Sequence, residues 1–180
     1  GLPLDAFVDP MSLDLMAAER MEIQRGPASV LYPAYLSQDF AGIQSPLTGT
    51  VNIILKENID HRETAVRTSY GSYNTFNTQA FHQDKRDNMN YFAGVNYESS
   101  DYTNYGTEGS WLNMQKDPEY TKLKLYGGAN FFYGTDKKNK FGVFVNKTNH
   151  KGDAGRVYRG FEHNYTTVNI SQRSEINDHM

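Results

Sequence analysis

The sequence predicts an antiparallel β-sheet that follows a shorter α+β segment at the amino end of the chain. From position 62 onward, apolar and polar residues alternate with a period of two, which is typical of strands with one apolar face. Tight turns and longer loops alternate between these segments. The apolar runs are all strand-sized, far shorter than the roughly 18 apolar residues expected of a membrane-spanning helix.

Composition and charge exclude several classes of function. The 180 residues are enough for one ordinary domain or for parts of two. A net charge of −3 argues against a nucleic-acid partner. The absence of cysteine excludes disulfides, thiolate chemistry and cysteine-based metal sites.

The amino-terminal segment begins with a predicted helix. Asp9 and Pro10 are typical of an N-cap and a first helical residue, and the apolar residues that follow predict a short helix up to about Glu19. A strand is expected from Met21 to Arg25, before the Gly26-Pro27 turn.

The apolar, β-branched run from Thr50 to Leu55 predicts a second, buried strand. The stretch between these strands, Ala34 to Gly49, has the composition of a loop. A loop of this length is either functional or mobile, or it is a packed insertion.

Six strands are predicted in the rest of the chain. Alternation is clear at 65–70, 91–98, 122–133 and 141–146, and weaker at 74–83 and 162–172. Several of these segments are close to the roughly 9–11 residues with which a tilted strand crosses a bilayer.

The connections between these strands differ in length. Tight turns are expected at Gly71–Tyr73, Asp84–Asn88 and Thr135–Asn139, and long loops at Ser99–Glu119 and Asn149–Gly160. Outer-membrane barrels have short periplasmic turns and longer outer loops. On that rule the Asp84–Asn88 and Thr135–Asn139 turns face the periplasm.

Two motifs occur in order before the first of these strands: ERMEIQRGPASVLY at 19–32 and GTVNIILK at 49–56. Together they resemble the last part of the plug domain of TonB-dependent outer-membrane receptors, in which an RGP turn is followed by a "GGVINIITK" strand and then by the barrel. The sequence motifs that carry the resemblance lie in residues 9–56. The rest of the chain matches the family only in its pattern of alternating strands. Pro33 and Thr50 stand where that family usually has glycine.

The resemblance implies a fold, a location and a function. Residues 1–57 would be the carboxyl-terminal part of a plug and 58–180 the first six or so transmembrane strands of a β-barrel with about 22 strands. The chain would then be an internal piece of a receptor in the outer membrane of a Gram-negative bacterium. It would not be an enzyme and would need no cofactor.

The implied activity is energised import of a scarce ligand. Ligands of the family include iron-siderophores, haem, cobalamin and oligosaccharides, and an iron-siderophore is expected first among them. The implied partners are the TonB energy-coupling complex, reached through a segment outside this chain, a small extracellular ligand such as a metal chelate, and membrane lipid. A soluble carbohydrate-binding β domain and a passive outer-membrane channel are the alternatives; a simple channel lacks the plug motifs.

By the same resemblance, Arg25, Gly26 and Pro27 form a latch in which the arginine pairs with carboxylates on the barrel wall. Its planar fork can bind a carboxylate through two hydrogen bonds. A solvent-facing arginine at a turn is the alternative. The loop aromatics Tyr102, Tyr105 and Trp111 are candidate ligand contacts, although ordinary loop packing would explain them equally well.

Alternation assigns side chains to the two faces of the predicted sheet. Polar residues expected to line a wet interior are Arg67, Asn96, Glu98, Lys122, Lys124 and Asn130. Aromatic residues expected to form a belt at the membrane interface are Tyr91, Tyr97, Tyr133 and Phe141. In a soluble sandwich the aromatic residues would instead be core and the charged face would meet solvent.

No catalytic or metal-binding pattern is recognised. The 5 histidines are scattered without metal-ligand spacing, and no phosphate-binding loop or nucleophile elbow occurs. Each histidine is therefore expected to be an ordinary polar residue, and no metal site is predicted.

Overall fold

The computed structural model describes residues 14–25, 49–102, 119–153 and 160–174. The chain divides into two compact units, Gly1–Lys56 and Glu57–Met180. In the described residues the structure is antiparallel β-sheet with two short 3₁₀ helices, η2 (Leu15–Ala17) and η3 (Thr135–Lys137). None of the helices found there has the length and apolar character needed to cross a membrane.

The first unit contains one pair of antiparallel strands, β1 (Ala18–Arg25) and β2 (Gly49–Leu55). Ile23 pairs with Val51 and Met21 with Ile53, so β-branched and apolar residues meet across the pair. The two strands predicted in this region are confirmed, but Ile53, Ile54 and Leu55 of the second strand are half-buried rather than buried. The longer connection between them lies outside the described residues, as do Gly26, Pro27 and most of the Ala34–Gly49 loop.

The helix predicted up to about Glu19 is wrong where the structure describes it. Asp14 caps the helix described there, because its side chain accepts a hydrogen bond from the Met16 backbone N–H at 2.9 Å; the predicted cap, Asp9, lies outside the described residues. That helix is a single 3₁₀ turn, and strand β1 begins directly after it at Ala18. The pairing of β1 with β2 outweighs the local helical pattern.

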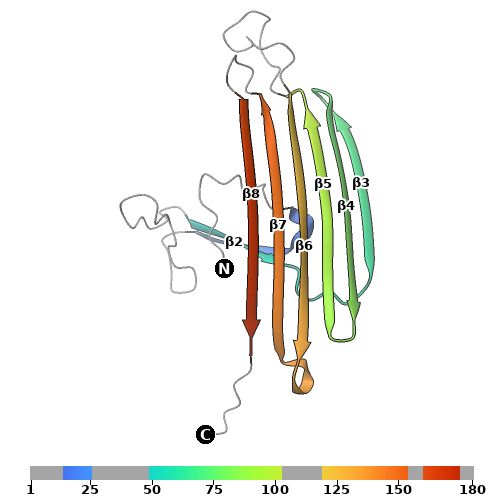
Figure 1. Cartoon of the computed structure of the whole chain (residues 1–180), viewed down its shortest axis with the longest axis vertical. Coiled ribbons are helices and arrows are strands. Elements are labelled where there is room, and N and C mark those ends of the chain that lie inside the picture. Colours follow the sequence, from blue (N-terminus) through green and yellow to red (C-terminus); the bar gives the residue numbers. More distant parts are fainter. Residues whose placement is uncertain (1–13, 26–48, 103–118, 154–159, 175–180) are drawn as a thin grey trace, which may run out of the picture. The chain divides into compact units, whose positions relative to one another are not determined.

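The second unit is one six-stranded antiparallel sheet in which every strand lies beside its neighbour in sequence (Figure 1). Its strands are β3 (Glu63–Gly71), β4 (Thr75–Arg86), β5 (Met89–Ser100), β6 (Tyr120–Tyr133), β7 (Asn139–Asp153) and β8 (Gly160–Arg173). The six strands predicted from alternation are confirmed. The structure shows this sheet open, with β3 and β8 at its edges.

The connections define two ends of the sheet. The turn after β3 lies at the upper end in Figure 1, and the turns after β4 and β6 lie at the lower end. Asp87 in the β4–β5 turn has a φ of +43°, and Gly134, Asp136 and Lys137 after β6 also have positive φ. Asp, Asn and Gly tolerate this conformation, which tight antiparallel connections require.

Three predicted connections are shorter than expected, the Ser99–Glu119 loop only slightly, because Ser99 and Ser100 belong to β5. Asp84 to Arg86 belong to β4, so the turn is only Asp87–Asn88. Similarly, 149–153 belong to β7, where Asn149 pairs with Asn164 and its side chain donates to the Asn164 Oδ1 at 2.6 Å. Polar composition indicated loops there, but strand pairing continues because cross-strand partners satisfy these polar groups.

Candidate functional site: the two faces of the sheet

The unbroken register of β3 to β8 sorts the side chains into two faces. On one face, called here the apolar face, one rung of paired residues runs Val66, Ala80, Val95, Leu125, Lys147 and Thr166. On the other, the polar face, an adjacent rung runs Arg67, Gln79, Asn96, Lys124, Thr148 and Tyr165. Alternate rungs belong to the same face because side chains alternate along each strand.

The apolar face is the more exposed of the two. Val66 is 70% exposed, Leu125 45% and Ile170 65%. The neighbouring residue Lys124, on the polar face, is only 7% exposed. A soluble sheet with one buried face shows the opposite pattern, with its apolar side chains covered and its charges in water.

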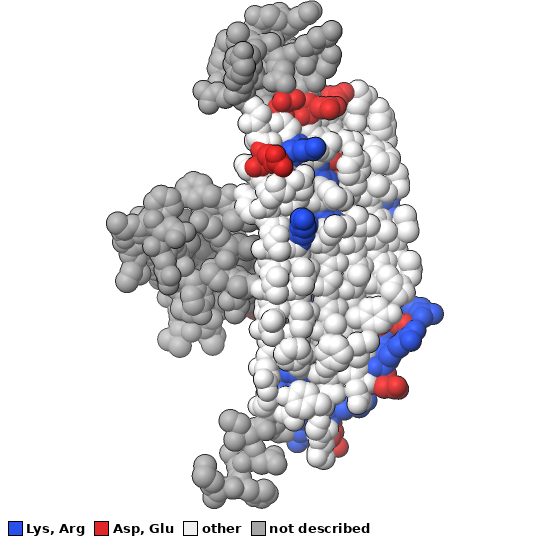
Figure 2. Space-filling model, viewed as in Figure 1, with Lys and Arg blue, Asp and Glu red and all other residues white. Residues whose placement is uncertain are grey.

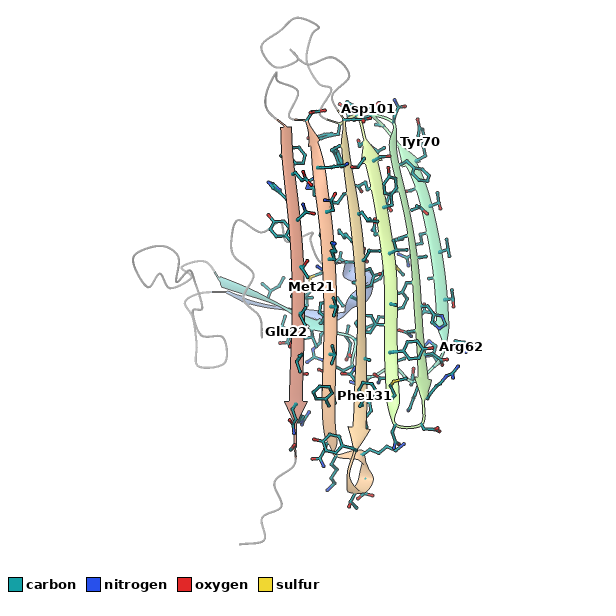
Figure 3. All side chains as sticks on the ribbon, in the orientation of Figure 1. Met21, Glu22, Arg62, Tyr70, Asp101 and Phe131 are labelled. Atoms are coloured by element: carbon teal, nitrogen blue, oxygen red, sulfur yellow. The ribbon has the colours of Figure 1, made fainter. Side chains whose placement is uncertain are left out.

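Aromatic residues lie toward both ends of the apolar face. Tyr91, Tyr97, Tyr133 and Phe141 all belong to it, as predicted from alternation. Phe131 and Tyr70 add to this set, and Figure 3 shows Tyr70 near the upper end of the sheet and Phe131 near the lower end.

Most charged residues on the apolar face lie toward its two ends; the exception is Lys147, which is exposed about halfway along β7. Figure 2 shows charged residues over the upper parts of β7 and β8 and near the lower ends of β3 and β4, with a broad uncharged area between. At the lower end, Arg62 donates to Asp84 from both Nε, at 3.2 Å, and a terminal nitrogen, at 3.0 Å. In the segment just before β3, a side-chain hydrogen bond with His61 lowers the pKa of the Asp60 carboxyl.

The six residues predicted to line an interior all lie on the polar face: Arg67, Asn96, Glu98, Lys122, Lys124 and Asn130. Lys124 and Asn130 are buried, and Arg67 on the edge strand is exposed. The structure therefore brings the six together on one surface. That this surface lines a lumen stays a prediction.

Hydrogen bonds connect the polar face into a network. The Asn77 amide donates to Asn96 Oδ1 and to a Glu98 oxygen, each at 3.1 Å, and the Tyr120 hydroxyl donates to Glu98 at 3.1 Å. Lower down, Asn130 donates to Asn90 Oδ1 at 3.0 Å. Such networks compensate the cost of removing polar groups from water.

Aromatic rings cross the middle of the polar face. Phe92 lies between Phe81 and Phe144, with ring centroids 6.3 and 6.2 Å apart. The Phe92 ring lies over Gly128, where an added Cβ would come within 2.7 Å of it. Glycine is therefore required beneath the ring, because a side chain at position 128 would collide with it.

The predicted latch and ligand contacts are only partly described. Arg25 is the last residue of β1 and its backbone pairs with Gly49, while its side chain, Gly26 and Pro27 lie outside the description. Tyr102 lies at the upper end of the sheet and stacks edge-on against Tyr73 at 5.6 Å. Tyr105 and Trp111 lie outside the described residues.

One group of residues was missed at the sequence level. His150 and His163 lie directly opposite each other on β7 and β8, on the polar face near its upper end. Tyr120, Phe161 and Tyr165 make ring contacts with these histidines. Their separation in sequence gave no signal, because only the register of the β7–β8 pair brings them together.

The comparisons with known proteins do not assign these surfaces. Searches against protein-family models, curated proteins and solved structures give no match to this chain. Within the described ranges, no group of three or more His, Cys, Asp or Glu side chains is placed to hold a metal ion.

Proposed function

We propose that Glu57–Met180 is part of the wall of an outer-membrane β-barrel, and that the chain belongs to a receptor that imports a scarce ligand with energy from TonB. The observation that supports the wall most strongly is the inversion of the two faces. Exposed side chains such as Leu125 are apolar, whereas the adjacent Lys124 is buried. This is the pattern of a sheet with lipid on one side and a polar lumen on the other.

The height of the apolar band fits this proposal. On β6 it runs from Leu123 to Phe131, which is eight residue steps or about 27 Å along the strand. A strand tilted by about 40° would cover about 21 Å of membrane depth over that length, close to the apolar band of roughly 25 Å in barrels of this kind.

The band also runs obliquely across the strands. We take the rung through Val66 and Thr166 as the reference level. On β3 the midpoint between the exposed apolar residues Val66 and Tyr70 lies two residues above this reference level. On β8 the midpoint between Val168 and Ile170 lies three residues below it.

This drift gives a strand tilt. A drop of five residues is about 17 Å along the strands, and five strand spacings are about 24 Å across them. If the band follows a plane parallel to the membrane, the strands are inclined by ~35° to the membrane normal. Closed barrels require a tilt of about 35–45°. The oblique course of the band therefore supports a barrel wall independently of the alternation within each strand.

Site-directed labelling tests the wall. The chain has no cysteine, so Leu125→Cys and Lys124→Cys each provide a single labelling position on opposite faces of one strand. We expect a nitroxide at 125 in the membrane-inserted protein to be relaxed by oxygen, which partitions into lipid, and one at 124 by a water-soluble nickel chelate. Equal access of the chelate to both positions would overturn the proposal and favour a soluble β domain.

Import is tested separately in the bacterium that carries the protein. Deletion of the gene should abolish growth on a ferric siderophore as sole iron source, and removal of the energy-coupling protein should have the same effect. Growth that needs the protein but not energy coupling would indicate a passive channel. Unchanged growth would exclude the siderophore as ligand and leave the labelling result to stand alone.

A further inference from the structure

Five rings form a continuous cluster on the polar face where β6, β7 and β8 approach their upper ends. His150 lies at its centre, with ring centroids 5.6 Å from Tyr120, 4.9 Å from Phe161 and 6.2 Å from His163. The His163 ring also lies 6.0 Å from that of Tyr165. No other pair of histidines is in ring contact in the part of the chain that the structure describes.

We propose that His150 and His163 together bind a divalent transition-metal ion, with Cu²⁺ held most tightly. Imidazole suits copper, zinc and nickel, and affinity among the first-row divalent ions is highest for Cu²⁺. Two imidazoles that share one metal, with metal–nitrogen bonds of about 2.0–2.1 Å, have ring centroids about 5 to 6.4 Å apart. The observed 6.2 Å lies within that interval, near its upper end.

The surroundings favour a site with open coordination positions. Phe161 and Tyr120 contact the His150 ring edge-on and limit its orientations. His163 is exposed, so water or an anionic donor from solution can complete the coordination sphere. Two protein ligands make a site that captures a metal or a metal complex reversibly, unlike the closed four-ligand sites of structural zinc.

The charges near the site nearly cancel. Lys122 lies opposite His150 on the same rung, and its charge opposes the binding of a cation. Glu98 is the next residue along that rung, directly opposite Lys122, and offsets it. The inference rests on this geometry alone and holds whether or not the sheet belongs to an importer.

His82 provides a matched control because it lies on the apolar face of β4, hydrogen-bonded to Thr64 at 2.7 Å. The purified protein in detergent micelles would be titrated with Cu²⁺ and examined by electron paramagnetic resonance. We expect one Cu²⁺ per chain with two nitrogen ligands. His150→Gln and His163→Gln should each weaken binding at least tenfold and remove one nitrogen from the spectrum, whereas His82→Gln should leave affinity within twofold of the unsubstituted protein.

A second measurement covers variants that do not fold. In the unsubstituted protein, Cu²⁺ should protect His150 and His163 from modification by diethyl pyrocarbonate and leave His82 reactive. A two-nitrogen signal that persists in either single variant would overturn the proposal. Equal protection of all three histidines would do the same, because it would show only nonspecific binding.

Discussion

An arginine scan along one rung tests whether the apolar band is oblique. Thr64 on β3 and Val168 on β8 share a rung on the apolar face, two residues below the reference level. Both lie on edge strands and both are exposed. A band parallel to the rungs would place them at the same depth, whereas the oblique band does not.

The difference in depth follows from the positions on each strand. Val168 is one residue from the centre of the band on β8, about 3 Å along the strand, so in the proposed barrel wall it would lie near the bilayer midplane. Thr64 is four residues below the centre on β3, about 14 Å along the strand, which at a tilt of ~35° is about 11 Å in depth. An arginine on the lipid face costs about 2–4 kcal/mol at the midplane and about 0–1 kcal/mol near the interface.

The assay is urea unfolding of the protein in phospholipid vesicles, with protease resistance as the readout. We expect Val168→Arg to shift the folding equilibrium by a factor of roughly 30 to 700, and Thr64→Arg by less than about fivefold. Asn169→Arg, on the opposite face beside Val168, controls for the charge itself and should change little. Equal losses for Val168→Arg and Thr64→Arg would refute the oblique band, and equal losses for 168 and 169 would refute a lipid-facing surface.

Three further predictions concern the predicted latch at Arg25, the rings of Phe81, Phe92 and Phe144 on the polar face, and the lower end of the sheet. Arg25→Ala should lower ligand uptake by on the order of tenfold while the amount of protein in the membrane stays unchanged. Arg25→Lys should be intermediate, because it keeps the charge but loses the planar fork. Uptake assays measure the first quantity and immunoblots the second. Gly128→Ala should cost about 1–3 kcal/mol in unfolding experiments because its Cβ meets the Phe92 ring at 2.7 Å, and the cost should fall in the Phe92→Leu background. Lys140→Ala should cost at most about 1 kcal/mol, less at high salt, because its ion pair with Glu57 is half open to water on the glutamate side.

Alternation in the sequence was sufficient to predict the sheet and its two faces. Residues 122–133 alternate over twelve positions, and the structure has one strand there with Leu125 exposed and Lys124 buried. The strand ends were harder to predict, because polar residues such as Asp84 and Asn149 are equally compatible with turns. Whether pairing continues through them depends on partners in another strand, which a local reading of composition does not include.

The histidine pair shows the consequence of that limit. A hairpin centred on the predicted loop, 149–160, would pair His150 with the residue four positions before His163, and not with His163 itself. The observed strand ends move the centre and bring the two histidines together. A shift of two residues in the centre of a hairpin therefore decides whether this pair exists, and turn composition does not determine the centre that finely.

Lys147 is the residue that most directly distinguishes an oblique apolar band from a band parallel to the rungs. It is exposed on the apolar face, on the same rung as Val95 and Leu125. In a band parallel to the rungs it would lie near the midplane at a cost of about 2–4 kcal/mol. On β7 the exposed apolar residues Phe141 and Val145 centre on Val143. In the oblique band Lys147 lies four residues above that centre, about 11 Å in depth at a tilt of ~35°, where a lysine can extend its ammonium group to the interface. Lys147→Leu should then change the free energy of unfolding in vesicles by no more than about 0.5 kcal/mol. A stabilisation of about 2 kcal/mol or more would place Lys147 in the middle of the membrane and remove the argument for tilted strands.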